Sequence, residues 1–183
     1  LTINKASGSV SLSNLTNLNV ANTFTLSNGT FNLGGNTLDV LVFSQSGGTF
    51  NANSGTINID QSMTISGGTF NGGTSTVVFD NPTDAYHSTL NIGNQSLNNL
   101  TVNITGSGIG LNVTGTADVN GNMTVTNVTF INTGTITLAG NLTSTDTSVG
   151  GTATITLDGT GTQTLNLTSG DLPDGTFTTA SKT

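Results

Sequence analysis

A repeat of about twenty residues constrains the fold of this chain more than any other feature. The motif Gly-Thr-Phe-Asn occurs at 29–32, 48–51 and 68–71. Phe50 follows Phe31 by 19 residues, and Phe70 follows Phe50 by 20. Similar steps predict one ladder of apolar core residues: Phe31, Phe50, Phe70, Leu90, Leu111 and Phe130. Recurrence at a fixed period is typical of repeat proteins in which each unit packs on the next.

Between these positions, most apolar residues alternate with polar ones, as in Phe24-Thr25-Leu26 and Thr56-Ile57-Asn58-Ile59. This period of two indicates half-buried strands, and the Gly, Asn and Ser residues between them favour turns. We therefore predict an all-β fold, a parallel β-solenoid (β-helix) of about eight coils with three short strands per coil of about 20 residues. Residues 1–183 form one domain in this interpretation. A β-sandwich is the alternative, but it does not require its strands to repeat in sequence.

The composition supports strands and narrows the range of partners. Charged residues make up 6% of the chain, against about 25% in typical domains. The sequence has only two basic residues and a net charge of −7. It therefore offers no basic patch for nucleic acid, and no apolar run is long enough to insert into a membrane. The ordered apolar spacing argues against disorder, despite the many Gly, Ser, Thr and Asn residues.

Two segments depart from the repeat: an insertion loop at 80–88 and a C-terminal segment at 170–183. The insertion contains the only Tyr and the only His, and we predict a contact loop formed by Asp84, Tyr86 and His87. The alternative is a longer turn whose Tyr packs on the next coil. Asp84 with His87 is also the best acid–base pair in the chain. Because no cluster of acids with basic partners accompanies it, we predict that the protein is not an enzyme.

Polar side chains recur beside the apolar ones. Stacked coils would form a structural ladder of amides from Asn32, Asn51, Asn71, Asn91 and Asn112. A single file of Thr25, Thr64, Thr124 and Thr143 resembles the arrays of ice-binding proteins, although those are usually paired and uninterrupted. No cofactor is predicted. Ca²⁺ is the one alternative, because Asp60, Asp80 and Asp158 follow strands that we expect to correspond.

The two ends of the predicted rod start and stop on strands without an amphipathic helix to cover them. Terminal coils of a solenoid expose unpaired N–H and C=O groups, which are a template for further pairing. Leu1, Ile3 and Phe177 are therefore predicted to be assembly ends that meet copies of the same chain.

Units such as Gly-Thr-Phe-Asn, Gly-Gly-Asn-Thr-Leu-Asp-Val and Ser-Gly-Thr-Ile-Asn-Ile-Asp resemble the β-strand repeats of large prokaryotic surface proteins. These include filamentous-haemagglutinin-like adhesins and the passenger domains of autotransporters. The resemblance covers nearly the whole chain and implies secretion and a role as stalk, adhesin or filament subunit. We expect an extracellular or cell-surface structural protein, a subunit of a filament, sheath or stalk that assembles end to end. The alternative is an adhesin segment that binds glycans or host surfaces.

Overall fold

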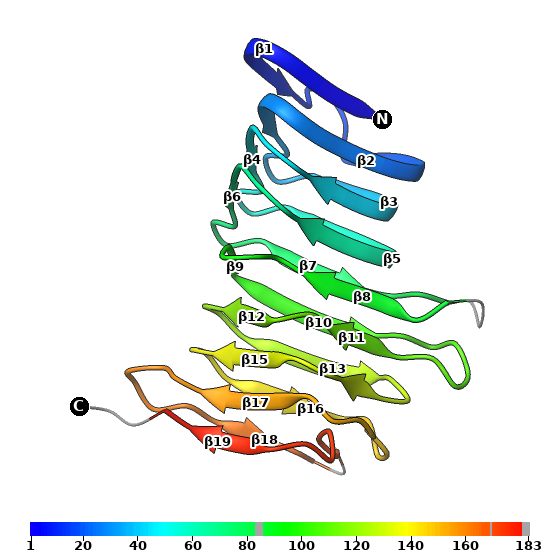
Figure 1. Cartoon of the computed structure of the whole chain (residues 1–183), viewed down its shortest axis with the longest axis vertical. Coiled ribbons are helices and arrows are strands. Elements are labelled where there is room, and N and C mark those ends of the chain that lie inside the picture. Colours follow the sequence, from blue (N-terminus) through cyan, green and yellow to red (C-terminus); the bar gives the residue numbers. More distant parts are fainter. Residues whose placement is uncertain (83–85, 169, 181–183) are drawn as a thin grey trace.

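The computed structural model describes residues 1–82, 86–168 and 170–180. Within these ranges the chain is all-β and contains no helix, so no helix is available that could cross a membrane. The strands wind into about nine stacked turns along the long axis of the molecule (Figure 1). The predicted parallel β-solenoid is therefore confirmed.

The strands shorten along the chain. The four longest, all in the first coils, run for 9 to 16 residues and bend around a corner, whereas the others hold 2 to 5. The strands are β1 (Thr2–Ser11), β2 (Asn17–Asn32), β3 (Thr37–Gln45), β4 (Thr49–Asn51), β5 (Thr56–Ile65), β6 (Thr69–Asn71), β7 (Thr76–Phe79), β8 (Ser88–Asn91), β9 (Ser96–Leu97), β10 (Asn99–Asn103), β11 (Leu111–Val113), β12 (Thr116–Val119), β13 (Met123–Asn127), β14 (Ile131–Asn132), β15 (Thr135–Leu138), β16 (Leu142–Ser144), β17 (Thr154–Leu157), β18 (Leu165–Asn166) and β19 (Phe177–Thr179).

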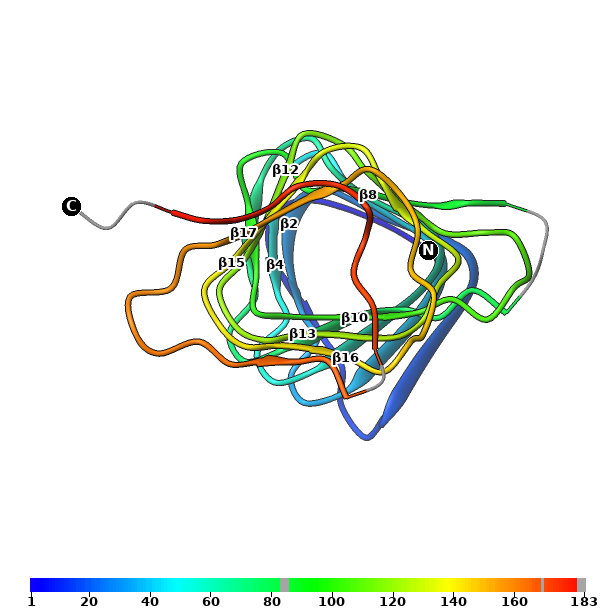
Figure 2. The same cartoon turned by 90° about the horizontal axis from the view of Figure 1, so that it is seen from below.

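Viewed along the axis, the coils superimpose in a rounded three-sided outline (Figure 2). The first face holds the beginnings of β2, β3 and β5, followed by β7, β10, β13, β16 and β18. The second face holds the beginning of β1, the middle of β2 and the later parts of β3 and β5, then β8, β11 and β14. The third face holds the ends of β1 and β2, then β4, β6, β9, β12, β15, β17 and β19.

The first face has the most continuous register. One residue from each of eight coils stacks in a single inward column: Leu18, Leu38, Ile57, Val77, Leu100, Met123, Leu142 and Leu165. All but the two outermost members are buried. Stacking in this way lets each short strand bury an apolar face that it could not bury alone.

Phenylalanine side chains fill the core of the N-terminal coils. On the third face, Phe31, Phe50 and Phe70 pair in register, and successive rings stack at 5.4 Å between centroids. Phe24 and Phe43 of the second face stack at the same spacing and meet Phe50 edge to face. The predicted ladder is therefore confirmed for these three residues.

Below Phe70 the predicted ladder is wrong. Leu90 pairs with Met63 on the second face, and Leu111 lies between Ser88 and Ile131 on that same face. Phe130 is half-buried and bridges to Gly150.

The reason is the insertion after β7. It places Leu90 27 residues after its true neighbour Met63, so a step of 20 from Phe70 reaches a different face. For the same reason, Leu100 is followed by Met123, not by the third-face residue Ala117.

Glycine at the corner between the second and third faces is required by the stacking itself. Gly48 and Gly68 have φ angles of +65° and +82°. A Cβ atom at Gly68 would lie 2.5 Å from the carbonyl oxygen of Gly48 in the coil above. No other residue fits a left-handed corner at this separation.

Candidate functional site

The outer surface of the third face is a regular array of polar side chains. In the upper coils Thr30, Thr49 and Thr69 form one column beside a column of Asn32, Asn51 and Asn71. In the lower coils two columns continue with small polar residues: Thr116, Thr135 and Thr154 in one, and Ser96, Asp118, Thr137, Thr156 and Thr178 in the other. Neighbouring rungs are about 4.8 Å apart, the spacing of paired strands.

The asparagine column of the upper coils is a hydrogen-bonded ladder. Asn71 Nδ2 donates to Asn51 Oδ1 at 2.7 Å, and Asn51 Nδ2 donates to Asn32 Oδ1 at 2.7 Å. Asn32 Nδ2 donates in turn to Ser11 Oγ at 2.9 Å. The predicted amide ladder is confirmed for these three asparagines.

The lower two members of the predicted ladder are elsewhere. Asn91 pairs with Thr64 on the second face, and its Oδ1 accepts from the Gly93 backbone N–H. Asn112 lies between Thr89 and Asn132, also on the second face. Both errors have the same origin as that of Leu90, since the insertion shifts the phase of the repeat.

The predicted threonine file is also wrong. Thr25 and Thr64 flank Ser44 on the second face, whereas Thr124 and Thr143 pair on the first face. The regular threonines are those of the third face, where Thr-Ile-Thr occurs at 135–137 and 154–156 in paired strands. This Thr-x-Thr spacing can be seen in the sequence. It was not assigned to one face, because the repeat was counted without the shift that the insertion introduces.

The third face is interrupted at its middle. β6 pairs with β4 alone and β9 pairs with β12 alone, so the two strands meet without a backbone ladder between them. Gln95 bridges the interruption, because its Oε1 accepts from the Phe70 backbone N–H at 2.9 Å. A surface groove of about 290 Å³ lies there, which we call the third-face groove. Its lining residues are Phe70, Asn71, Gly72, Gly73, Ser96, Leu97, Asn98 and Asn120.

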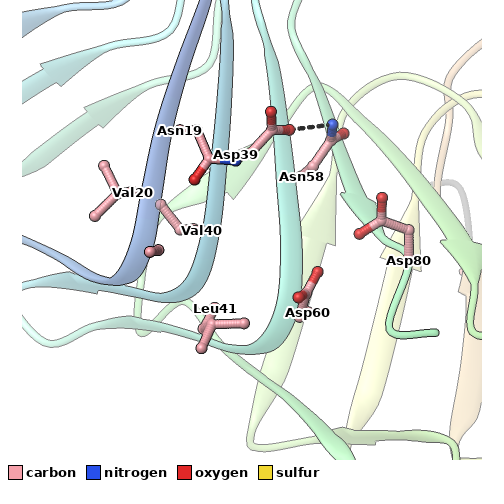
Figure 3. A pocket seen from close by; sticks show the side chains of 9 residues that line it. Asn19, Val20, Asp39, Val40, Leu41, Asn58, Asp60 and Asp80 are labelled. Carbon is pink, nitrogen blue, oxygen red and sulfur yellow. Dashed lines mark hydrogen bonds between the residues drawn. The ribbon is translucent and has the colours of Figure 1, made fainter. Parts of the chain in front are cut away.

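An acidic pocket of about 350 Å³ lies at the corner where the first face ends (Figure 3). Asp39, Asp60 and Asp80 line it together with Asn58 from three successive coils. Asn58 Nδ2 donates to Asp39 Oδ1 at 2.6 Å. Asp60 and Asp80 were expected to be neighbours, and they are.

Two of the three carboxyl groups of this pocket, those of Asp60 and Asp80, have raised pKa values. Burial and, after it, the charges of Asp60 and Asp39 together raise the pKa of Asp80 to about 6. Burial also raises the pKa of Asp60, while its hydrogen bond with Asp80 opposes that change. Because their hydrogen bond raises the pKa of Asp80 and lowers that of Asp60, Asp80 is the carboxyl that takes up a proton first as the pH falls.

Asp158 does not belong to this group, contrary to the prediction. It follows β17 on the third face, whereas Asp60 and Asp80 come directly after the paired first-face residues Ile59 of β5 and Phe79 of β7. No cluster of three or more His, Cys, Asp or Glu residues in 1–82, 86–168 and 170–180 is arranged to hold a metal ion.

The predicted contact loop is described only in part. Tyr86 is 64% exposed, and His87 lies on the surface with its ring 5.0 Å from that of Phe130. Asp84 lies outside the described residues. Tyr86 does not sit beneath a neighbouring coil, so the alternative of a packed turn is not what the structure shows. The contact role itself remains a prediction.

Sequence reasoning missed a second asparagine column, at the corner between the third and first faces. Here each side-chain oxygen accepts a backbone N–H of the next coil: Asn99 Oδ1 from Asn122, Asn122 Oδ1 from Asn141, and Asn141 Oδ1 from Thr164. The distances are 2.7–2.9 Å. The spacings of 23 and 19 residues could have revealed this column had the insertion been placed correctly.

The strands of the terminal coils each have one unpaired edge within the described residues. β1 pairs only with β2, β18 only with β16, and β19 only with β17. Of the predicted assembly ends, Leu1 and Phe177 are exposed by 52% and 40%, whereas Ile3 is buried.

Comparison of the chain with protein-family models, curated proteins and solved structures found no match. The stacked coils and their parallel register nevertheless define the class: this is a β-solenoid repeat protein.

Proposed function

We propose that the protein is a non-enzymatic structural rod, a subunit of an extracellular filament, sheath or stalk that joins copies of itself end to end. The observation that carries this proposal is the open strand edge at each terminal coil. An edge strand exposes a row of backbone donors and acceptors that another strand can pair with.

The side chains at these edges suit such a joint. Leu1, Leu165 and Phe177 are among the few large apolar residues that are strongly exposed. Leu165 continues the inward column of the first face, and Phe177 continues that of Ile136 and Ile155 on the third face. A further coil stacked in the same register would bury both residues.

The low charge and the resemblance to prokaryotic surface repeats support a location outside the cell. A rod with 6% charged residues has few sites for proteases that cleave at Lys or Arg, because the chain contains only two basic residues. The cell-surface location is tested by fractionation of the source cells and antibody labelling without permeabilisation.

The assembly is tested by light scattering behind size exclusion and by negative-stain microscopy over a range of concentrations. We expect rods that lengthen with concentration. Phe177→Lys places a charge on one open edge and should shorten them, because lysine on an edge strand opposes pairing. Tyr86→Lys is the matched control on the side of the rod and should leave the length unchanged. A monomer at every concentration would refute the proposal.

The second candidate function is that of an adhesive segment that binds glycans. The polar array of the third face, in which Asp118 is the one acidic member, favours it, since Asn, Thr and Ser side chains both donate and accept hydrogen bonds. A monodisperse protein that binds oligosaccharides would support this candidate over the first.

A further inference from the structure

We propose that the third-face groove binds a sugar ring of a neutral oligosaccharide. This inference rests on the second candidate function and is independent of end-to-end assembly.

The groove exists because the coil between β6 and β9 has a different path. Its corner between the second and third faces holds Gly93-Asn94-Gln95 with a positive φ at Gly93, whereas the coil above has Ser66-Gly67-Gly68 with a positive φ at Gly68. Gln95 is not part of a strand, but its side-chain Oε1 accepts a hydrogen bond from the Phe70 backbone N–H. The remaining edge of β6, with Gly72 and Gly73 after it, carries no side chain that fills the space.

Side-chain amides on both walls of the groove can form further hydrogen bonds. Asn71 is the last rung of the amide ladder and uses Nδ2 to bond Asn51. Among the described residues no donor reaches Asn71 Oδ1, although the corresponding oxygens of Asn32 and Asn51 each accept from the next coil. On the opposite wall, Asn98 Nδ2 has one long contact of 3.4 Å, to the Ser75 carbonyl oxygen.

A hydroxyl group completes such an arrangement, because it can donate to Asn71 Oδ1 and accept from Asn98 Nδ2 at once. Ser96 and Asn120 add a further hydroxyl and a further amide along the walls. Adjacent hydroxyl groups on one ring are the property of sugars, and about 290 Å³ is a volume on the scale of a small-ligand site.

The uncharged lining of the groove favours a neutral ligand. No lining residue of the groove is ionisable. The nearest acidic residue in register, Asp118, pairs with Ser96 and accepts from Thr137 Oγ1 at 3.0 Å. Together with the net charge of −7, this carboxylate disfavours anionic glycans.

An extended peptide does not fit as an added strand. A strand between β6 and β9 would need both edges free, but the Phe70 N–H is already bonded to Gln95. A Cβ atom at Gly72 would lie 3.3 Å from the Asn98 backbone nitrogen, so the two coils are already in contact beneath the groove and no further strand can be inserted between them.

The test is isothermal titration of the full chain with neutral hexasaccharides of glucose, xylose and N-acetylglucosamine, and with a polygalacturonate of equal length. We expect at least one neutral hexasaccharide to bind, and the anionic one not to bind. Gly72→Ala, which fills the groove, and Asn98→Ala, which removes one wall amide, should each weaken binding by about tenfold or more, which is about 1.4 kcal/mol.

Gly35→Ala is the matched control. It adds the same methyl group to the equivalent corner of an earlier coil, 3.3 Å from a side-chain oxygen of Ser54, and should leave the affinity unchanged. Circular dichroism verifies the fold of each variant. If Gly72→Ala does not fold, Asn98→Ala and the side-chain amide NMR signals of Asn71, Asn98 and Asn120 carry the test.

Three results would overturn the site. One is equal binding by wild type and both groove variants, which would place the ligand elsewhere while keeping the adhesive function. Another is preference for polygalacturonate or for a threonine-rich peptide. The third is no binding of any neutral hexasaccharide, which would remove both the site and the adhesive function but leave end-to-end assembly to its own test.

Discussion

The upper coils (17–71) and the lower coils (76–179) stack in the same parallel register, but they differ in their corners and in the residues of their core. The upper coils have short corners and an aromatic core, in which five phenylalanines contact one another across two faces. The lower coils have longer connections after the first face, such as 104–110, and a core mainly of Leu, Ile, Val and Met, with Phe79 as its one fully buried phenylalanine among the described residues. The comparison indicates that the parallel register, and not one side-chain type, defines the architecture.

The asparagine columns differ in the same way. In the upper coils side chain bonds to side chain along the third face, so the ladder is separate from the backbone. In the lower coils side chain bonds to the backbone N–H of the next coil at a corner, where it replaces a strand hydrogen bond. The first kind of column adds stability to a formed stack, and the second kind satisfies turns that would otherwise be unpaired.

The largest expected effect is on the aromatic core. Phe50 is fully buried, and its ring contacts those of Phe24, Phe31, Phe43 and Phe70. Phe50→Ala should lower the free energy of unfolding by about 3–5 kcal/mol, and Ile136→Ala in the lower core by about 2–5 kcal/mol. Urea denaturation of both variants measures the difference. A larger loss for Ile136→Ala would show that the aromatic cluster is not the more stable region.

Corner glycines should give the next largest effect, and should separate tight from open corners. Gly115 has a φ of +70°, and a Cβ atom added to it would meet no other atom within 4 Å, whereas one added to Gly68 would meet the Gly48 carbonyl oxygen. Gly115→Ala should cost about 1–2 kcal/mol from backbone strain alone. Gly68→Ala should cost more, because the clash adds to the strain. Equal losses in thermal denaturation would contradict the tight stacking of the upper corners.

The asparagine columns should give a smaller difference. Asn51→Ala removes two ladder hydrogen bonds, each of which contributes about 0.5–1.5 kcal/mol. Asn122→Ala removes one side-chain bond, to the Asn141 N–H. We expect the loss of stability to be about twice as large for Asn51→Ala, as measured by urea denaturation. The reverse order would show that the corner column is the more important one.

The smallest effect concerns pH. The pKa of Asp80 rises from 3.8 to about 6 on folding, so the folded state retains a proton that the unfolded state releases near pH 4. This stabilisation is complete below pH 4 and is lost as the pH rises through about 6. The melting temperature should therefore fall slightly between pH 4 and pH 7, and solvent screening limits the change.

Asp80→Asn should remove that part of the pH dependence, because the amide does not titrate. Asp171→Asn, which removes a charge from an exposed turn, is the control and should retain it. An unchanged pH profile in Asp80→Asn would show that Asp80 is not the carboxyl with the raised pKa.

Much of the fold was predictable from residues 17–79, where three coils repeat with steps of 19 and 20 and the Phe and Asn columns are visible by eye. The errors all follow one event. The insertion after β7 lengthens one coil, and Leu90 happens to occur where a step of 20 predicts an apolar residue. Strand alternation is the same on every face, so periodicity alone cannot assign a strand to its face.

The candidate sites were less predictable for a related reason. The acidic pocket was predictable in part, because Asp60 and Asp80 follow the paired first-face segments of β5 and β7. The third-face groove was not visible, since it depends on a ladder that fails to form between β6 and β9. An unmade contact leaves no residue pattern in the sequence.

The amide ladder makes the two ends of the rod inequivalent. Every Nδ2 group in it donates toward the N-terminal coils, so the side-chain dipoles of Asn32, Asn51 and Asn71 point the same way and add. A neighbour stacked in the same orientation would continue both this polarity and the parallel strand direction. A neighbour stacked in reverse would oppose the dipoles and face antiparallel strands, so the proposed end-to-end assembly predicts joints in a single direction, as open filaments require.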